Sequence, residues 1–230
     1  MHRRPMLFAP ALLFSGIAAP TRATAGVPRI VVELLTSQSC SSCPPADDLL
    51  ARLVATRPEI LALSFHVTYW NRLGWRDPFS LQAATERQRR NAASLGHSHV
   101  YTPQLVVQGQ RDVIGSEQAA VMAALAAATA LRVPVSIEAV RDRVEIVIGA
   151  GAGGGQIWLV GFDGRHTTAV ARGENGGRRL SHTHVVRSLA PVGAWQGMVA
   201  RGSTARPDGE QVAVLVQAAD GAILGAATAA

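Results

Sequence analysis

The chain has 230 residues, of which 48% are hydrophobic and 17% are charged, a composition typical of a folded protein with a sizeable core. Its formal net charge is +6, and all 22 basic residues are arginine. The lack of lysine excludes a Schiff-base lysine and a phosphate-binding P-loop. No basic stripe with interleaved aromatic residues is visible, so we expect no nucleic-acid partner.

The first 25 residues have the pattern of a secretory signal peptide. MHRR is a basic start, MLFAPALLFSGIAA is a short apolar core, and Ala23-Thr24-Ala25 is an A-x-A cleavage site before Gly26. The apolar core is short and interrupted by Pro10, and no later segment is long and apolar enough to cross a bilayer. We therefore expect a mature chain that is periplasmic or secreted, with no membrane span after signal removal.

Residues 29–130 alternate between strand and helix patterns. Strand patterns cover 29–37 and 59–70, and a hairpin pattern covers 103–115 with its turn near Gly109; helix patterns cover 44–58, 79–96 and 116–130. This alternation predicts an α/β domain over residues 26–131, with helices covering a sheet.

From Val133 onward the helical periodicity stops. Short apolar runs follow one another, separated by turns such as the glycine-rich stretches at 151–155 and 174–177. Short strands at regular spacing predict a smaller all-β domain, sandwich-like or barrel-like, over residues 132–230.

The two cysteines of the chain, Cys40 and Cys43, lie where the first strand pattern gives way to the first helix pattern. A helix N-terminus would stabilise the thiolate of an exposed Cys40, and a buried Cys43 could resolve a mixed disulfide from within the same turn. One alternative is a structural disulfide, although so short a loop would stabilise the fold little. Another is a partial metal site, for which His97 and His99 are the nearest further ligands. The strand–CxxC–helix context favours the redox interpretation.

Four ordered segments resemble a known protein family. VELLTSQSCSSCPPAD, FHVTYWNRLGWRDPFS, VYTPQLVVQG and RGENGGRRLSHTHVVRSL together look like a bacterial secreted family of unknown function with a thioredoxin-like fold, domain-of-unknown-function family 1223. The resemblance covers nearly the whole mature chain. It implies a thioredoxin-like domain over residues 26–131 with Cys40 and Cys43 as the redox pair, and it implies no particular substrate. Thr68 and Asn71 stand where the family pattern has aspartates, so the resemblance supplies no acid beside His66.

The same resemblance gives meaning to two further sites. It implies that the Thr102–Pro103 bond is cis and faces the disulfide, where the preceding backbone would be open to pair with a substrate peptide. It also suggests that Glu33, in a strand expected to be buried, relays a proton to the resolving cysteine. The alternative for Glu33 is a carboxylate that faces solvent or pairs with an arginine.

Aromatic residues concentrate between residues 66 and 79. His66, Trp70 and Trp75 are candidates for a substrate-binding groove, and the alternative is that they pack an inserted loop onto the sheet. His182 and His184 could place two imidazoles on one strand face, as a transition metal requires, but an exposed His-x-His pair more often has no ligand.

Together these features predict an exported thiol–disulfide oxidoreductase with no organic cofactor, which acts on protein or small-molecule thiols and disulfides. One rival is a copper carrier that binds the metal through the thiolates of Cys40 and Cys43 and a histidine. The other is a non-catalytic binding module whose disulfide has no redox role. The direction of exchange depends on the reduction potential, which the sequence does not determine.

Overall fold

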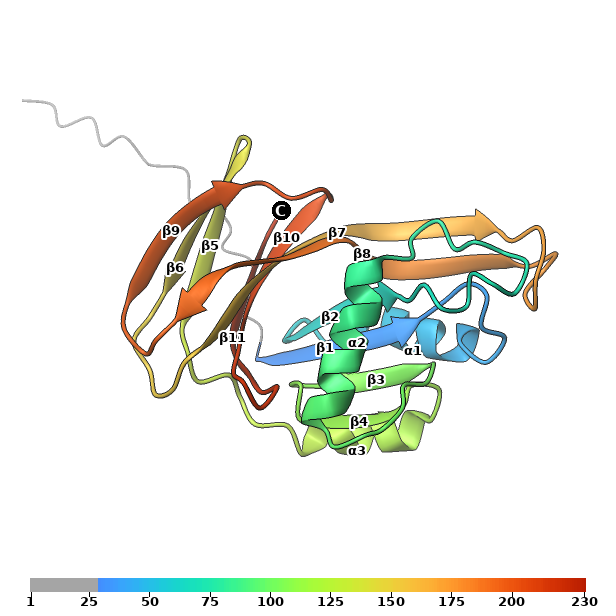
Figure 1. The fold of residues 1–230 in the computed structure, drawn as a ribbon, viewed down its shortest axis with the longest axis horizontal. Helices are drawn as coiled ribbons and strands as arrows, with labels where there is room; N and C mark the ends of the chain where they lie inside the picture. Colours follow the sequence, from blue (N-terminus) through green and yellow to red (C-terminus); the bar gives the residue numbers. More distant parts are fainter. Residues whose placement is uncertain (1–28) are drawn as a thin grey trace, which may run out of the picture.

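The computed structural model describes residues 29–230, which form eleven β-strands and three α-helices (Figure 1). The predicted signal peptide, residues 1–25, lies outside the described residues. In chain order the elements are β1 (Ile30–Thr36), α1 (Pro44–Thr56), β2 (Ile60–His66), α2 (Gln82–Ser94), β3 (Gln104–Val107), β4 (Arg111–Ile114), α3 (Gln118–Ala126), β5 (Val135–Val140), β6 (Arg143–Ile148), β7 (Gly155–Ala169), β8 (Arg179–Trp195), β9 (Ala200–Ala205), β10 (Gln211–Gln217) and β11 (Ile223–Ala229).

Eight of the strands form one mixed sheet in the order β11-β10-β7-β8-β2-β1-β3-β4. The central pairs β1–β2 and β2–β8 are parallel, and the other neighbours are antiparallel. The parallel contact between β2 and β8 is short, with Ser64 opposite Val185. The remaining strands form a second sheet in the order β5-β6-β9.

The predicted fold class is therefore wrong. The described chain is mostly β, and strands from both predicted domains share a single large sheet, so it is not an α/β thioredoxin-like domain followed by a smaller all-β domain. The alternation of apolar residues identified the later segments as strands, but it does not tell which sheet edge a strand joins. The outer edge of β2 accepts β8, which brings β7, β10 and β11 into the sheet. The predicted boundary at residue 131 lies between α3 and β5, and the large sheet continues across it.

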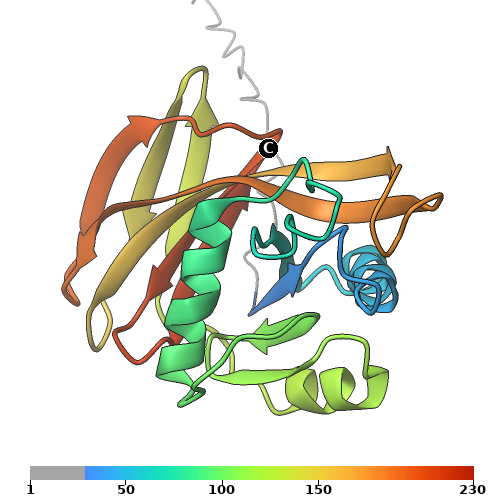
Figure 2. The ribbon, with the colours of Figure 1, turned by 45° about the vertical axis from the view of Figure 1, so that its right-hand side comes forward.

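Different elements cover the two faces of the large sheet (Figure 2). Because successive strand residues point to opposite faces, a single strand contributes side chains to two cores. On β10, Ala213 and Leu215 belong to the core under α2, together with Phe65 of β2. Val212 and Val214 belong instead to the core shared with the three-stranded sheet. Near the other end of the large sheet, α1 and α3 cover the face opposite α2.

The β7–β8 hairpin runs from the core under the three-stranded sheet to the cysteine motif. Its strands have 15 and 17 residues, longer than any other described strand, whereas the sequence pattern suggested several short ones. The pairing register shifts at Ile157/Trp158 and at Gly161/Phe162, which lets the strands bend without ending. One end of the hairpin contributes Trp195 to the core under the three-stranded sheet. The other end, residues 170–178, reaches back to the segment that carries the cysteines.

Candidate functional site

Cys40 and Cys43 form a disulfide at the start of α1. Cys43 is the N-cap residue, and the helix begins at Pro44, a residue type that suits the first helical position. The backbone N–H of Cys43 donates to the carbonyl of Cys40 at 3.2 Å, which closes the tight turn of the motif. Cys40 is only 1% exposed and Cys43 is fully buried. The expectation of an exposed Cys40 is therefore wrong for the disulfide-bonded protein.

The segment around Pro103 lies against the sulfur of Cys40. The Thr102–Pro103 bond is cis, as predicted. The Thr102 hydroxyl donates to Cys40 Sγ at 3.3 Å, and its oxygen accepts the indole N–H of Trp70 at 2.7 Å. Ser42 Oγ lies 3.4 Å from the same sulfur. The structure thus gathers Cys40, Thr102, Pro103 and Trp70 at one place.

The tip of the β7–β8 hairpin, residues 170–178, covers the cysteine motif from outside. The buried Asn175 amide donates to the carbonyls of Gln38 and Cys40 at 2.9 and 3.0 Å. The carboxylate of Glu174 accepts the Ser41 N–H at 3.0 Å, and hydrogen bonding from Ser41 holds the pKa of Glu174 below its ordinary value. These contacts tie the hairpin tip to the loop that contains Cys40.

Trp75 and Gln38 hold the inner side of this loop. The indole N–H of Trp75 donates to Gln38 Oε1 at 3.0 Å, and the Ser39 hydroxyl donates to the Trp75 carbonyl at 2.7 Å. The Gln38 amide in turn donates to Thr168 Oγ1 of β7 at 3.0 Å. Trp75 is only half-buried, so its contacts fix the cysteine loop while part of the ring faces outward. Its role in substrate binding stays a prediction, as does that of Trp70.

Behind the disulfide, His66 is fully buried and paired with an acid. Its Nδ1 lies 2.7 Å from Asp77 Oδ2, and Asp77 also accepts the backbone N–H groups of Gln38 and Phe79. Burial raises the pKa of Asp77, but the attraction of His66 and these hydrogen bonds outweigh it, so the net pKa is lowered. The acid beside His66, which the resemblance did not supply, is therefore Asp77.

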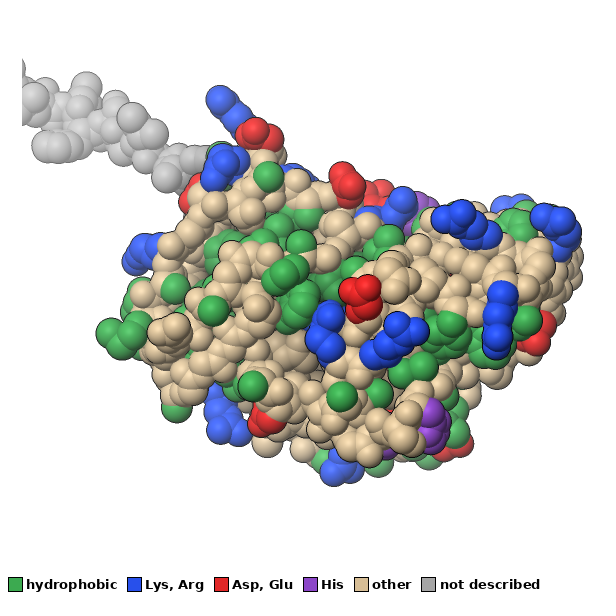
Figure 3. Space-filling model, in the orientation of Figure 1, with side chains coloured by type: hydrophobic (Ala, Val, Ile, Leu, Met, Phe, Trp, Pro, Cys, Tyr) green, Lys and Arg blue, Asp and Glu red, His purple; other side chains and the backbone are tan. Residues whose placement is uncertain are grey.

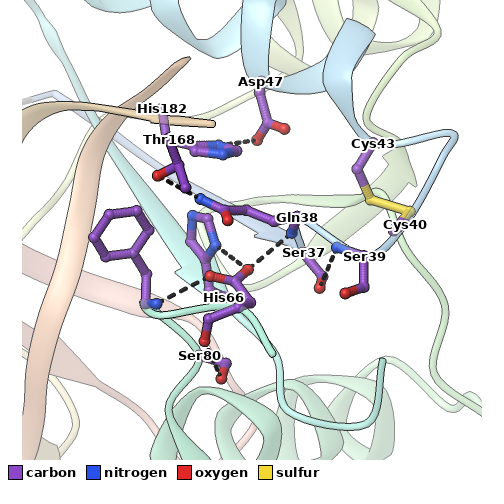
Figure 4. Close-up of polar contacts among 12 residues, drawn as sticks. Ser37, Gln38, Ser39, Cys40, Cys43, Asp47, His66, Ser80, Thr168 and His182 are labelled. Carbon is purple, nitrogen blue, oxygen red and sulfur yellow. Dashed lines mark hydrogen bonds and ion pairs between the residues drawn. A yellow bond between two sulfur atoms is a disulfide. The ribbon is translucent and has the colours of Figure 1, made fainter. Parts of the chain in front are cut away.

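His182 of β8 lies next to His66 and faces α1. The two imidazole rings meet edge-on, with centroids 4.6 Å apart, and His182 Nδ1 lies 3.5 Å from Asp47 Oδ1. Burial lowers the pKa of His182, but the nearby acids, Asp47 first among them, together outweigh this effect and the pKa is raised above 6.5. In Figure 4, Asp47 and His182 point toward one another.

His184 does not join this cluster. Its Nδ1 lies 2.8 Å from the carbonyl oxygen of Ala62, to which it donates, and burial lowers the pKa of its imidazole. His182 and His184 thus lie against different groups, the Asp47 carboxyl and the Ala62 carbonyl. Among residues 29–230, no three His, Cys, Asp or Glu side chains are grouped so that they could hold a metal ion.

Glu33 forms a buried ion pair with an arginine. Its two carboxylate oxygens accept Nε and Nη2 of Arg87 at 2.6 Å each, and the Asn91 amide lies 3.3 Å from one of them. Both charged side chains are buried. This geometry supports the ion-pair interpretation of Glu33, and the proton-relay role remains a prediction without a supporting contact.

Sequence reasoning missed several residues that surround the disulfide. Asp47 was visible only as an acid in the first turn of a helix, and Asp77 only as part of an aromatic segment. Glu174 and Asn175 lie more than 130 residues beyond the cysteines, and no local pattern indicates that their loop returns to them. The acid in the WRDPF stretch, eleven residues after His66, was the one signal that could have suggested a His–Asp pair.

Two cavities lie away from the disulfide. One of about 410 Å³ lies between α2 and the strand ends near Trp158 and Gln217. The other, of about 210 Å³, lies between β6, β8 and β9 and is lined mainly by aliphatic side chains. On the face shown in Figure 3, hydrophobic side chains gather in the hollow beside the three-stranded sheet, and the arginines are scattered. No helix among residues 29–230 is long and apolar enough to cross a membrane.

Comparison with known proteins identifies a family and two solved structures that the chain resembles. The family model described as "Protein of unknown function (DUF1223)" matches residues 31–217. The crystal structure of a protein from Agrobacterium tumefaciens is similar, with 35% identity and a TM-score of 0.78 over 88% of this chain and 94% of that chain. HBP35 of Porphyromonas gingivalis shares the fold alone, with 13% identity and a TM-score of 0.59 over 88% of this chain and 75% of that chain. No curated protein matches the chain.

Proposed function

The chain belongs to this DUF1223 family, and we propose that it is an exported thiol–disulfide oxidoreductase that works through Cys40 and Cys43. The observation that carries the proposal is the Cys40–Cys43 disulfide at the start of α1, with the Thr102 hydroxyl on the sulfur of Cys40. A helix start and a hydroxyl donor both stabilise a thiolate, which is the species that exchanges with a disulfide.

The surroundings of the two sulfurs suggest different roles. Cys40 Sγ has the hydroxyls of Thr102 and Ser42 within hydrogen-bonding range, whereas Cys43 is fully buried at the helix start. A partner thiolate attacks Cys40 Sγ, the bond to Cys43 breaks, and Cys43 leaves with the electron pair. In the opposite direction, the Cys43 thiolate attacks Cys40 in the mixed disulfide and releases the partner thiolate.

Exchange requires the covering groups to move. Cys40 is only 1% exposed, so a partner sulfur can approach along the axis of the disulfide only after neighbouring groups move, and the hairpin tip is one of these because Asn175 binds the Cys40 carbonyl. The proposal therefore includes displacement of residues 170–178 by the partner. Because the tip is held by few polar contacts, local opening of this segment costs less than global unfolding.

The proposed compartment is the periplasm or the outside of the cell. The signal pattern over residues 1–25 supports export, and an intramolecular disulfide persists in an oxidising compartment. The substrates we propose are protein or small-molecule thiols and disulfides.

Trapping experiments test the proposal. We expect Cys43→Ala to accumulate mixed disulfides with partners in the cell envelope, because no thiol remains to resolve the bond at Cys40. The matched variant Cys40→Ala should accumulate none. Acid-quenched extracts separated on non-reducing gels measure both. Trapping by Cys40→Ala alone would reverse the two roles, and no trapping by either variant would contradict thiol–disulfide exchange.

A further inference from the structure

We propose that Asp47 and His182 form a buried proton store that exchanges one proton with Cys43. The inference rests on the proposed function, since it concerns the opening and closing of the same disulfide. Its evidence is separate, because it comes from α1 and β8 behind the sulfurs and not from the contacts of Cys40.

Cys43 needs a proton partner inside the protein. Its side chain is fully buried, so a thiolate released there has no water to stabilise it. A charge without a partner in such surroundings is strongly destabilised, and the thiolate must gain a proton promptly. In the opposite direction, the buried thiol must lose its proton before it can attack.

Asp47 is placed one helical turn from Cys43. Cys43 has helical backbone angles, φ −76° and ψ −36°, and its carbonyl accepts the N–H of Asp47 at 3.1 Å. Residues four apart on a helix share one face, with their Cβ atoms roughly 5–6 Å apart. Asp47 is 4% exposed, so its carboxyl is buried, as the sulfur of Cys43 is.

Asp47 and His182 both have free hydrogen-bonding capacity. Asp47 Oδ1 and both ring nitrogens of His182 are buried without a hydrogen-bond partner, although Asp47 Oδ1 lies 3.5 Å from His182 Nδ1. Buried polar atoms are nearly always satisfied, and exceptions occur where a group has a chemical role. A carboxyl and an imidazole at this separation can hold one shared proton and release it.

The neighbouring charges favour storage of that proton. His182 faces Asp47, and its pKa is raised also by Asp77 and by the exposed Asp48. Its other neighbours are the ring of His66, which is oriented by Asp77, and the ring of Phe79. The surrounding acids stabilise the protonated imidazole and burial destabilises it, so the imidazole can both accept and release the proton.

The proton step balances in both directions. When a partner thiolate attacks Cys40, the Cys43 thiolate takes the proton from the Asp47–His182 pair and becomes a thiol. When Cys43 resolves a mixed disulfide, the pair takes the proton from its thiol, the new thiolate attacks Cys40, and the partner thiolate leaves to be protonated by solvent.

The test follows the second half of an exchange reaction. Ellman's reagent reacts with the reduced protein to form a mixed disulfide at Cys40 and releases a first coloured thiolate, and resolution by Cys43 releases a second. We expect Asp47→Asn to slow the second release at least about tenfold near pH 7, with a smaller effect near pH 9, where hydroxide replaces the relay. Asp48→Asn removes the adjacent exposed acid, which has the weakest effect of the three acids that raise the pKa of His182, so it should slow the second release far less than Asp47→Asn.

A second measurement needs no variant and remains informative if Asp47→Asn does not fold. The midpoint of the His182 imidazole titration, followed by NMR, should shift between the oxidised and the reduced wild-type protein. Equal pH profiles for the two acid variants, or a His182 titration that ignores the redox state, would overturn the proton store alone. If the wild-type protein itself never released the second thiolate, the proposed function would fail instead.

Discussion

The sulfur of Cys40 is held by a short chain of side chains. Trp70 donates to the hydroxyl oxygen of Thr102, and that hydroxyl donates to Cys40 Sγ. Because the indole occupies a lone pair of the hydroxyl oxygen, the Thr102 hydrogen is directed toward the sulfur. A hydrogen bond to an ionised acceptor is about twice as strong as a neutral one, so Thr102 favours the Cys40 thiolate over the thiol.

We expect Thr102→Val to make reduced Cys40 less reactive. Loss of one hydrogen bond to a thiolate corresponds to about tenfold slower alkylation by iodoacetamide near pH 7. Thr36→Val is the matched control, because the Thr36 hydroxyl is buried without a hydrogen-bond partner. An equal alkylation rate in wild type and Thr102→Val would show that the hydroxyl does not stabilise the thiolate.

At the scale of elements, the hairpin tip is a polar clamp on the cysteine loop. Gly173 within it has φ +78°, and a Cβ built on this residue would lie 3.2 Å from both the Leu73 carbonyl oxygen and Trp75 Cβ. Glycine therefore serves both the turn and the close approach to the Trp75 loop. The Asn175 amide adds the bonds to the carbonyls of Gln38 and Cys40. The clamp joins three segments that are far apart in sequence.

We expect Asn175→Ala to loosen this clamp. The substitution leaves the Gln38 carbonyl without its amide partner and should lower the free energy of unfolding by about 1–3 kcal/mol. If opening of the hairpin tip limits access to the disulfide, lowering the stability of the closed tip by about 1.4 kcal/mol corresponds to roughly tenfold faster reduction by dithiothreitol. Gln156→Ala removes an exposed side chain–backbone bond at the opposite end of the hairpin, far from the cysteines, and serves as the control. A reduction rate equal to that of the control would show that the tip does not limit access.

Local elements of the fold were predictable because local chemistry sets them. The helix predicted over 44–58 is observed at Pro44–Thr56, where prolines start it, and the predicted 79–96 helix is observed at Gln82–Ser94, just before Gly96. The hairpin turn near Gly109 is confirmed, and this glycine has φ +68°. The two cysteines were found for the same reason, since they belong to a compact motif, whereas the cis Thr102–Pro103 bond was implied by the family resemblance.

The pairing of distant strands was not predictable from one sequence. The contact of β2 with β8 has a single registered residue pair, and no residue type marks it. The long hairpin was divided into several runs because non-apolar stretches, such as Gly164-Arg165-His166 within β7, interrupt the series of apolar residues. The roles of Asn175 and His182 depend on this pairing, so they could not be seen before the strands were placed.

At the scale of the whole molecule, one core joins the two halves of the sequence. Leu63 and Phe65 of β2 pack in the same cluster as Phe162 of β7, Val186 of β8 and Leu215 of β10. A cut near residue 131 would expose this cluster on both fragments. Full burial of one large apolar side chain contributes about 1.5–3 kcal/mol, so neither fragment retains the stability of the whole.

We expect the mature protein to unfold in one cooperative transition. Urea curves from far-UV circular dichroism and from tryptophan fluorescence should coincide, because the tryptophans lie in both halves, at 70 and 75 and at 158 and 195. Fragment 132–230 expressed alone should lack a cooperative transition. Two separated transitions in the intact chain, or a cooperative fragment, would show independent domains.

The order of the large sheet has one more consequence, at the end occupied by β4. A strand at a sheet edge offers unpaired backbone groups to other chains, which invites aggregation. β4 has only four residues, and two of them, Arg111 and Asp112, are charged. Asp112 accepts hydrogen bonds from Tyr101 and Gln104 and therefore keeps its charge at the rim. A short edge with charges of both signs is a poor template for a further strand, so this edge of the sheet is ill suited to pairing with a second molecule.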